Sequence, residues 1–177
     1  MSKITDSEFI SDLSTHHVAL EASTSHVLET IAVIPNNLHY VKPETGWSVA
    51  QILTHLCETE KFSLKTLQAT GKSTEGRPPD EWVRKLEKAL LRRDREYSAP
   101  QVTLPNEKNA IEPDLKRFSD YRREMHVIID QFDLTETCAQ SPHPVVGYMT
   151  RIEWIYFTVF HGYRHAEQMR LVAETSS

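Results

Sequence analysis

Apolar residues recur at helical spacing in four long stretches of the chain. The first stretch runs from about Ser7 to Ile34, with apolar positions three, four or seven residues apart, and Pro35 ends it. The third begins near Pro113, a residue suited to the first turn of a helix, and its apolar positions alternate steps of three and four up to Phe132. No stretch alternates convincingly with period two, so the sequence predicts an all-α protein.

The second and fourth stretches each open on a residue pair with the spacing of a capping box. Ser48 stands three residues before Gln51, and Thr150 stands three residues before Glu153. In such a pair each side chain satisfies a backbone N–H group that has no partner inside the helix. The sequence therefore predicts helices that start at Ser48 and Thr150, and the first of these is expected to end at Gly71.

The connection between the second and third long helices spans residues 71–112 and matches no motif. Gly71 to Pro79 is predicted to form a loop, and Asp80 can cap a short helix that follows it. Ser98 to Pro113 holds three prolines and is expected to be extended or looped. Four long helices with one long connection predict an antiparallel four-helix bundle, and the length of 177 residues suits a single domain over residues 1–177.

Composition and charge exclude several classes of protein. The 20 Lys and Arg against 25 Asp and Glu give a net charge of -5, so no basic excess is available to bind nucleic acid. The most apolar run, Trp154 to Phe160, is far shorter than the roughly 20 residues that a membrane-spanning helix needs. The first residues lack a signal-peptide core and the 2 cysteines are too few for a disulfide framework, so we expect a cytoplasmic protein without a membrane contact.

Two histidines stand on the apolar stripe of the fourth helix. His161 and His165 are four residues apart, so their imidazoles lie on one face and can chelate one metal ion. His55, at the border of the inner face of the second helix, is the best candidate for a third ligand. Three neutral imidazoles would leave the charge of a divalent ion uncompensated. The fourth coordination position would then hold water or an anionic ligand such as a thiolate. The alternative is a set of core histidines bonded to other side chains.

Three further residues are candidates for a catalytic role. Glu58 lies one turn from His55 and could orient a ligand or act as a base, although a surface glutamate on a helix needs no such role. Arg122 falls inside the apolar seam of the third helix, where it would bind a substrate carboxylate or pair with a glutamate such as Glu58 or Glu153. His143, in the loop before the fourth helix, could reach the mouth of the site or be purely structural.

Two segments of the chain resemble the motifs of the DinB-like superfamily. Residues 46–56 (GWSVAQILTHL) are similar to its second-helix motif, in which a tryptophan precedes the helix and a histidine follows. Residues 143–169, with His143 and Pro144, Glu153 and Trp154, and then His161 and His165, are similar to its C-terminal motif. The two segments occur in the order that the superfamily has, so together they are more specific than either alone.

The resemblance implies an antiparallel four-helix bundle with a long crossing between helices two and three, often assembled as a homodimer. The metal-binding histidines of the superfamily map onto His55, His161 and His165, with nickel or zinc as the expected ion. Characterised relatives include S-transferases that use low-molecular-weight thiols such as bacillithiol, and a mycothiol-dependent maleylpyruvate isomerase. Others are described as metal-dependent hydrolases, and many have no known activity.

We therefore expect a cytoplasmic metal-dependent enzyme that acts on a small-molecule substrate. Thiol-dependent S-transfer is preferred to hydrolysis, because a three-histidine dication favours an anionic sulfur ligand and the sequence offers no obvious general base. The segment from residue 71 to residue 112 is where substrate specificity is expected. The alternative, from another class, is a non-catalytic helical bundle that binds a small molecule or a partner, with the metal structural or absent.

Overall fold

The computed structural model describes residues 12–74, 76–92, 99–105, 109–143 and 146–176. These residues are mostly helical, as the sequence predicts, with five α-helices, two short 3-10 helices and one two-stranded sheet. The elements in chain order are α2 (Leu13–Val33), η1 (Asn36–Leu38), α3 (Val49–Gln68), β1 (Gly71–Lys72), α4 (Val83–Leu90), η2 (Gln101–Thr103), α5 (Ile111–Gln131), β2 (Thr137–Cys138) and α6 (Arg151–Thr175).

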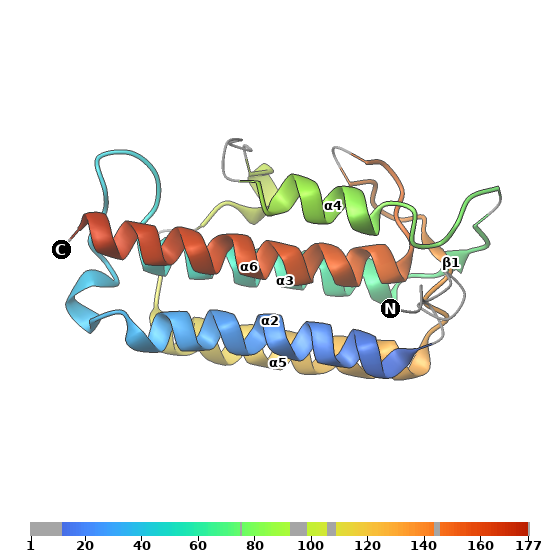
Figure 1. Ribbon diagram of the computed structural model, residues 1–177, viewed down its shortest axis with the longest axis horizontal. Helices are drawn as coiled ribbons and strands as arrows, with labels where there is room; N and C mark the ends of the chain where they lie inside the picture. The colour runs from blue at the N-terminus through green and yellow to red at the C-terminus, as the bar shows by residue number, and fades with distance from the viewer. Residues whose placement is uncertain (1–11, 75, 93–98, 106–108, 144–145, 177) are drawn as a thin grey trace, which may run out of the picture.

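The four long helices run side by side, and the short helix α4 lies against the outer side of α6 (Figure 1). Helix α2 packs against α5 and α6, and helix α3 packs against the same two helices. The histidines predicted as ligands belong to α3 and α6, so the contact between these two helices positions the candidate site. No helix in the described ranges has the length and apolar character needed to cross a membrane.

The core of the molecule divides into two apolar clusters stacked along the helices. One cluster gathers around Trp154 and Met125, near the start of α6, and the other gathers around Leu53, Phe118 and Met169, near its end. On α3, the buried residues between the two clusters are polar, and they include Thr59, Glu60 and Ser63. A polar layer therefore separates the two halves of the core at mid-height.

The capping boxes predicted at Ser48 and Thr150 are both present. Ser48 Oγ accepts from Gln51 N–H at 3.3 Å, and Ser48 N–H donates to Gln51 Oε1 at 3.0 Å. Thr150 and Glu153 form the equivalent pair at the start of α6. These helix starts depend on residues close in sequence, which is why the local pattern predicts them correctly.

The ends of the other long helices are close to the prediction. Helix α5 begins at Ile111, slightly before Pro113, which falls in its first turn as expected. Helix α2 is capped by Asp12, whose carboxylate accepts from Thr15 N–H. The predicted start of this helix at Ser7 lies outside the described residues.

The sequence did not predict the small sheet formed by β1 and β2. The strands pair antiparallel, with Gly71 opposite Cys138 and Lys72 opposite Thr137. A strand of two residues is too short to show an alternating pattern, so no periodicity could reveal it. The sheet joins the chain after α3 to the chain before α6.

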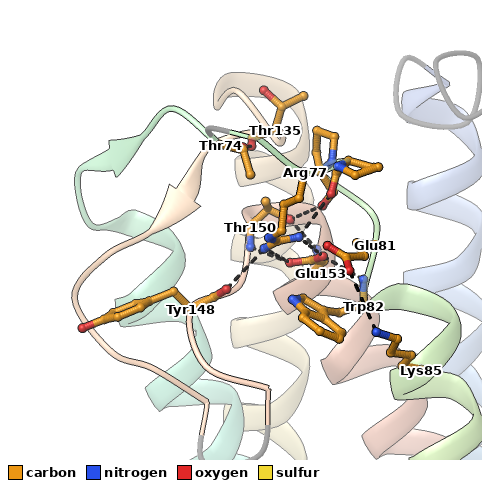
Figure 2. A network of polar contacts seen from close by, with 11 residues as sticks. Thr74, Arg77, Glu81, Trp82, Lys85, Thr135, Tyr148, Thr150 and Glu153 are labelled. Carbon is orange, nitrogen blue, oxygen red and sulfur yellow. Dashed lines mark hydrogen bonds and ion pairs between the residues drawn. The ribbon is translucent and has the colours of Figure 1, made fainter.

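A buried carboxylate fastens the connection between α3 and α4 to the start of α6 (Figure 2). Glu153 is 0% exposed and accepts from Arg77 Nη1 at 2.6 Å and from Arg77 Nη2 at 2.8 Å. It also accepts from the backbone N–H groups of Trp82 and Thr150, both at 2.9 Å. Because the carboxylate serves both as the capping residue of α6 and as the anchor of Arg77, it fixes the path of the connection.

Candidate metal centre

Three histidines from two helices meet between α3 and α6. His55 Nε2 lies 3.4 Å from His161 Nε2, which in turn lies 3.0 Å from His165 Nε2. One ligand nitrogen from each of the three rings falls within 4.8 Å of the others, and all three residues are buried. The structure thus brings together the three residues that the sequence singled out as candidate ligands.

The register of two antiparallel helices creates this meeting point. Arg151, at the start of α6, donates to the carbonyl of Leu67, near the end of α3, at 2.9 Å. His55 lies about three turns before Leu67 on α3, which places it opposite the middle of α6. His161 and His165 lie there, one turn apart on the same face.

Hydrogen bonds fix how two of the rings present their nitrogens. His55 Nδ1–H donates to the carbonyl of Thr103 at 2.7 Å, and His165 Nδ1–H donates to Gln168 Oε1 at 2.7 Å. Both acceptors are oxygens without a proton, so in a neutral imidazole the lone pair is on Nε2. The two Nε2 lone pairs therefore point at the Nε2 atom of His161, which can donate a single proton to only one of them.

Burial keeps the three rings in the form that binds metal. Burial lowers the pKa of His55, and burial followed by the nearby His165 and His55 lowers the pKa of His161 well below its ordinary value. The pKa of His165 falls to about 3, mainly because the ring is buried and then because of His55. All three imidazoles are neutral at pH 7, and neutral imidazole is the state that ligates a metal ion.

Aromatic side chains pack against two of the three imidazoles. The Trp47 ring lies 5.0 Å from the His55 ring, and Phe157 stacks on His161 at 5.2 Å with an interplanar angle of 24°. His143, a predicted candidate, lies 5.0 Å from Phe157, so Phe157 contacts both His143 and His161. Burial lowers the pKa of His143 to about 4. Within the described ranges, His143 does not join the group of converging ligand atoms.

Glu58, another predicted candidate, is engaged with helix α5. Its carboxylate accepts from Arg117 Nη2 at 2.5 Å, and Arg117 also binds Asp114 at 2.8 Å. The Glu58 side chain is 20% exposed. The structure therefore places this carboxylate in an ion-pair network between α3 and α5.

Arg122 pairs with a glutamate that the sequence analysis did not consider. Its Nη2 atom donates to Glu60 Oε1 at 2.6 Å and to the carbonyl of Thr158 at 2.9 Å, and both charged side chains are almost completely buried. The expected partners Glu58 and Glu153 were wrong, because Arg117 holds the first and Arg77 holds the second.

A signal for Glu60 was present in the sequence. The residue lies four positions after Leu56 and four before Leu64, so it occupies the buried stripe of α3. A single acidic residue on a buried stripe needs a cation, and the single basic residue on the seam of α5 is Arg122. Pairing the two exceptions would have identified the contact.

The donor set of the cluster fits a divalent transition metal. Three neutral imidazoles can face one ion, and no carboxylate belongs to the converging group found among the described residues. Imidazole ligands suit zinc, nickel, copper and iron, whereas magnesium and calcium prefer oxygen ligands. Because His161 Nε2 can donate a proton to only one of the other two Nε2 atoms, at least one pair of nitrogens faces each other without a proton in the metal-free rings. A cation bound by all three nitrogens fits this arrangement better.

Comparison with known proteins places the chain in a family. A sequence model described as the DinB superfamily matches residues 19–169, a range that contains His55, His161 and His165. Nothing among curated proteins and nothing among solved structures matches the chain. Since the match spans most of the 177 residues, the protein belongs to the DinB superfamily.

Proposed function

We propose that the protein is a metal-dependent enzyme that transfers a small-molecule substrate to a low-molecular-weight thiol. In this proposal His55, His161 and His165 hold a divalent ion, with nickel or zinc as the expected metal. The observation that carries the proposal is the convergence of three Nε2 atoms. Two of the rings, those of His55 and His165, are oriented by hydrogen bonds that their Nδ1 atoms make.

The charge of the site favours a thiol as the activated group. When bound, a divalent ion at three neutral imidazoles supplies a positive charge that stabilises the thiolate, the reactive form of a thiol. Arg122 and Arg164 add positive potential, and this potential contributes to the low pKa of His161. The same potential that opposes a proton on the ring attracts an anionic ligand.

The carboxylates near the site support S-transfer over hydrolysis. Hydrolysis of a substrate by water needs a general base within hydrogen-bonding reach. On the described parts of α3 and α6, Glu58, Glu60 and Glu153 each bind an arginine instead. The neutral ring of His143 is the remaining candidate for a general base, and it packs against Phe157. A thiol that is already ionised at the site needs no such base.

The arrangement of the chain beyond the site is also part of the proposal. We infer that the four long helices form the antiparallel four-helix bundle of the superfamily, with residues 71–112 as the crossing that selects the substrate. We further expect a homodimer, with no nucleic-acid or membrane partner, in the cytoplasm. Sedimentation of the purified protein tests the assembly state.

The test begins with protein purified without a histidine tag. Elemental analysis should find stoichiometric nickel or zinc, and the loaded protein is then screened with several low-molecular-weight thiols against a chromogenic electrophile. His161→Ala should lose both the metal and the turnover, whereas His126→Ala, a histidine of α5, should keep both. Turnover that survives His161→Ala contradicts the proposal.

Two other outcomes separate the alternatives. Metal-dependent ester or amide hydrolysis in the absence of thiol would favour a hydrolase. Bound metal with no activity in either screen would favour a binding module in which the metal stabilises the fold, and a melting experiment with a chelator would measure that contribution.

A further inference from the structure

Most of the unpartnered buried polar atoms of the described residues lie in or beside the layer that separates the two apolar clusters. Buried polar groups in folded proteins almost always have a hydrogen-bond partner, so a group of exceptions requires an explanation. In the described ranges, all but one of the buried side-chain nitrogen and oxygen atoms without a partner belong to α3, α5 or α6. The atoms are Thr59 Oγ1, Glu60 Oε2, Ser63 Oγ, Arg122 Nε, Arg122 Nη1, Trp154 Nε1, His161 Nδ1 and, elsewhere, Asn109 Oδ1.

One of these atoms belongs to a proposed metal ligand. The Nδ1 atoms of His55 and His165 have acceptors, whereas Nδ1 of His161 has none. A histidine that binds a metal through Nε2 carries its proton on Nδ1, and that N–H group normally donates to a carboxylate, a carbonyl or a water. His161 therefore needs an acceptor on the side facing away from the metal.

Helix geometry places two unpartnered polar side chains of α3, Thr59 and Glu60, at the height of the His161 ring. Thr59 lies four residues after His55 on the same face, so it sits one turn further along the contact between α3 and α6. A side chain in a helix leans toward the N-terminus of the helix, which directs the His161 ring toward the level of Thr158. Glu60 lies at this level, because Arg122 binds both Glu60 and the carbonyl of Thr158.

The packing of α6 brings the ion pair close to His161. A Cβ atom placed on Gly162 would lie 3.1 Å from Arg122 Nη2 and 2.5 Å from Ser23 Oγ. The absence of a side chain at Gly162 thus lets the Arg122 guanidinium reach the backbone beside His161. Glu60 keeps one oxygen on Arg122 and leaves Oε2 without a partner.

We propose that Thr59 and Glu60 are positioning residues for His161, acting through a buried water molecule; this inference rests on the proposed metal centre. The water accepts the Nδ1–H proton of His161 in a hydrogen bond and donates to Glu60 Oε2 and Thr59 Oγ1. Three such bonds are typical of a buried water. The negative charge of Glu60 makes the imidazole a stronger ligand, as carboxylates do behind metal-bound histidines.

The test uses Zn²⁺ alone as the probe and two nearly isosteric variants. Glu60→Gln and Thr59→Val should each weaken Zn²⁺ binding about tenfold to hundredfold in competition with a chelator. Glu58→Gln and Thr66→Val are the matched controls, because Glu58 binds Arg117 and Thr66 Oγ1 donates to the carbonyl of Phe62. Both controls should bind Zn²⁺ as the wild-type protein does.

A spectroscopic signature separates positioning from a purely structural role. In protein labelled with ¹⁵N-histidine and loaded with Zn²⁺, the His161 Nδ1–H proton should exchange slowly with solvent in the wild type. The same signal should shift and exchange faster in Thr59→Val and Glu60→Gln, and it should be unchanged in the controls.

The outcomes are distinguishable. Variants that bind Zn²⁺ with wild-type affinity and show an unchanged Nδ1–H signal overturn this inference and leave the metal centre intact. A wild-type protein that binds no Zn²⁺ through the three histidines overturns the proposed function itself. If Glu60→Gln fails to fold because Arg122 loses its charged partner, Thr59→Val decides the question, since it leaves the ion pair in place.

Discussion

Helix α6 carries two buried polar centres, and they differ in whether their polar atoms have hydrogen-bond partners. Around Glu153, at the start of the helix, each oxygen of a buried carboxylate receives donors from Arg77 and from backbone N–H groups (Figure 2). Around His161, about two turns later, three Nε2 atoms face one another and Nδ1 of His161 has no partner. The first centre is satisfied by groups of the chain itself, and the second is the one at which we propose a bound metal ion.

This difference is what we expect between a structural polar site and the proposed metal-binding site. Both centres are buried and both combine residues distant in sequence, so burial and convergence alone would not distinguish them. Hydrogen-bond satisfaction does, because an unsatisfied buried group costs about 1–3 kcal/mol and is retained where a ligand or water compensates it. A change of conditions or sequence at one centre should therefore leave the other centre unchanged.

The largest expected effect is a loss of folding stability in mild acid, caused by the buried histidines in and beside the His161 centre. The folded-state pKa values of His143 and His165 are about 4 and about 3, below the ordinary value of 6.5. The unfolded chain therefore binds more protons, and stability present above pH 6.5 is lost as the pH falls toward these values. Between pH 7 and pH 5 the two rings together should cost the metal-free protein about 4 kcal/mol.

Denaturant titrations of the chelator-treated protein at several pH values measure this loss. Replacing His143 with Ala should reduce it by about 2 kcal/mol, because one of the two rings no longer titrates. Arg77, in the other centre, has a raised pKa and stays charged throughout this range. A stability that does not change from pH 7 to pH 5 would refute the account of the buried neutral rings.

Breaking the ion pair of the Glu153 centre should lower the free energy of unfolding without affecting metal binding. Glu153→Gln removes the negative charge that faces Arg77, and breaking a buried ion pair in this way costs about 3 kcal/mol. Urea unfolding measures the loss, and Zn²⁺ affinity of the folded variant should equal that of the wild type. A variant that loses Zn²⁺ binding while folded would show that the two centres are coupled.

Completing the histidine centre should raise stability. With free Zn²⁺ at 100 times its dissociation constant, the bound ion should stabilise the protein by about 2.7 kcal/mol. Thermal melting with and without a chelator measures the difference. His161→Ala should show no such difference, and Glu153→Gln should show the full one; equal responses of the two variants would be inconsistent with this assignment.

A change at Gly162 should have the smallest effect. An added methyl group meets Ser23 Oγ and Arg122 Nη2, and overpacking of this kind costs about 1–3 kcal/mol. The better helix propensity of Ala offsets about 1 kcal/mol of this cost, so Gly162→Ala should destabilise the protein by about 1 kcal/mol. Urea unfolding is the readout, and a stabilised variant would show that the Arg122 side chain moves aside freely.

The parts of the molecule that the sequence predicted correctly depend on local spacing. The capping boxes at Ser48 and Thr150 and the four-residue step from His161 to His165 need no knowledge of the tertiary fold. Convergence of His55 with the other two requires the register of α3 against α6. The place of His55 at the border of the inner face made it the best candidate, and the family resemblance pointed to the same residue.

The parts that it missed depend on contacts between distant segments. Arg77 binds Glu153 across the long connection, and nothing in the local pattern around either residue identifies its partner. The pairing of β1 with β2 is too short to leave a periodic signal. The prediction for Arg122 named Glu58 and Glu153 and missed Glu60, the acidic residue on the buried stripe of α3.

X-ray absorption at the metal edge of tag-free protein, in thiol-free buffer, tests the central claim most directly. The account predicts a stoichiometric divalent ion with three imidazole nitrogens at about 2.0–2.1 Å, the distance typical of zinc, plus a light-atom ligand that an added thiol replaces with sulfur. His161→Ala should abolish this spectrum. A protein that takes up no metal, or one whose ion is held by protein ligands other than His55, His161 and His165, would contradict it.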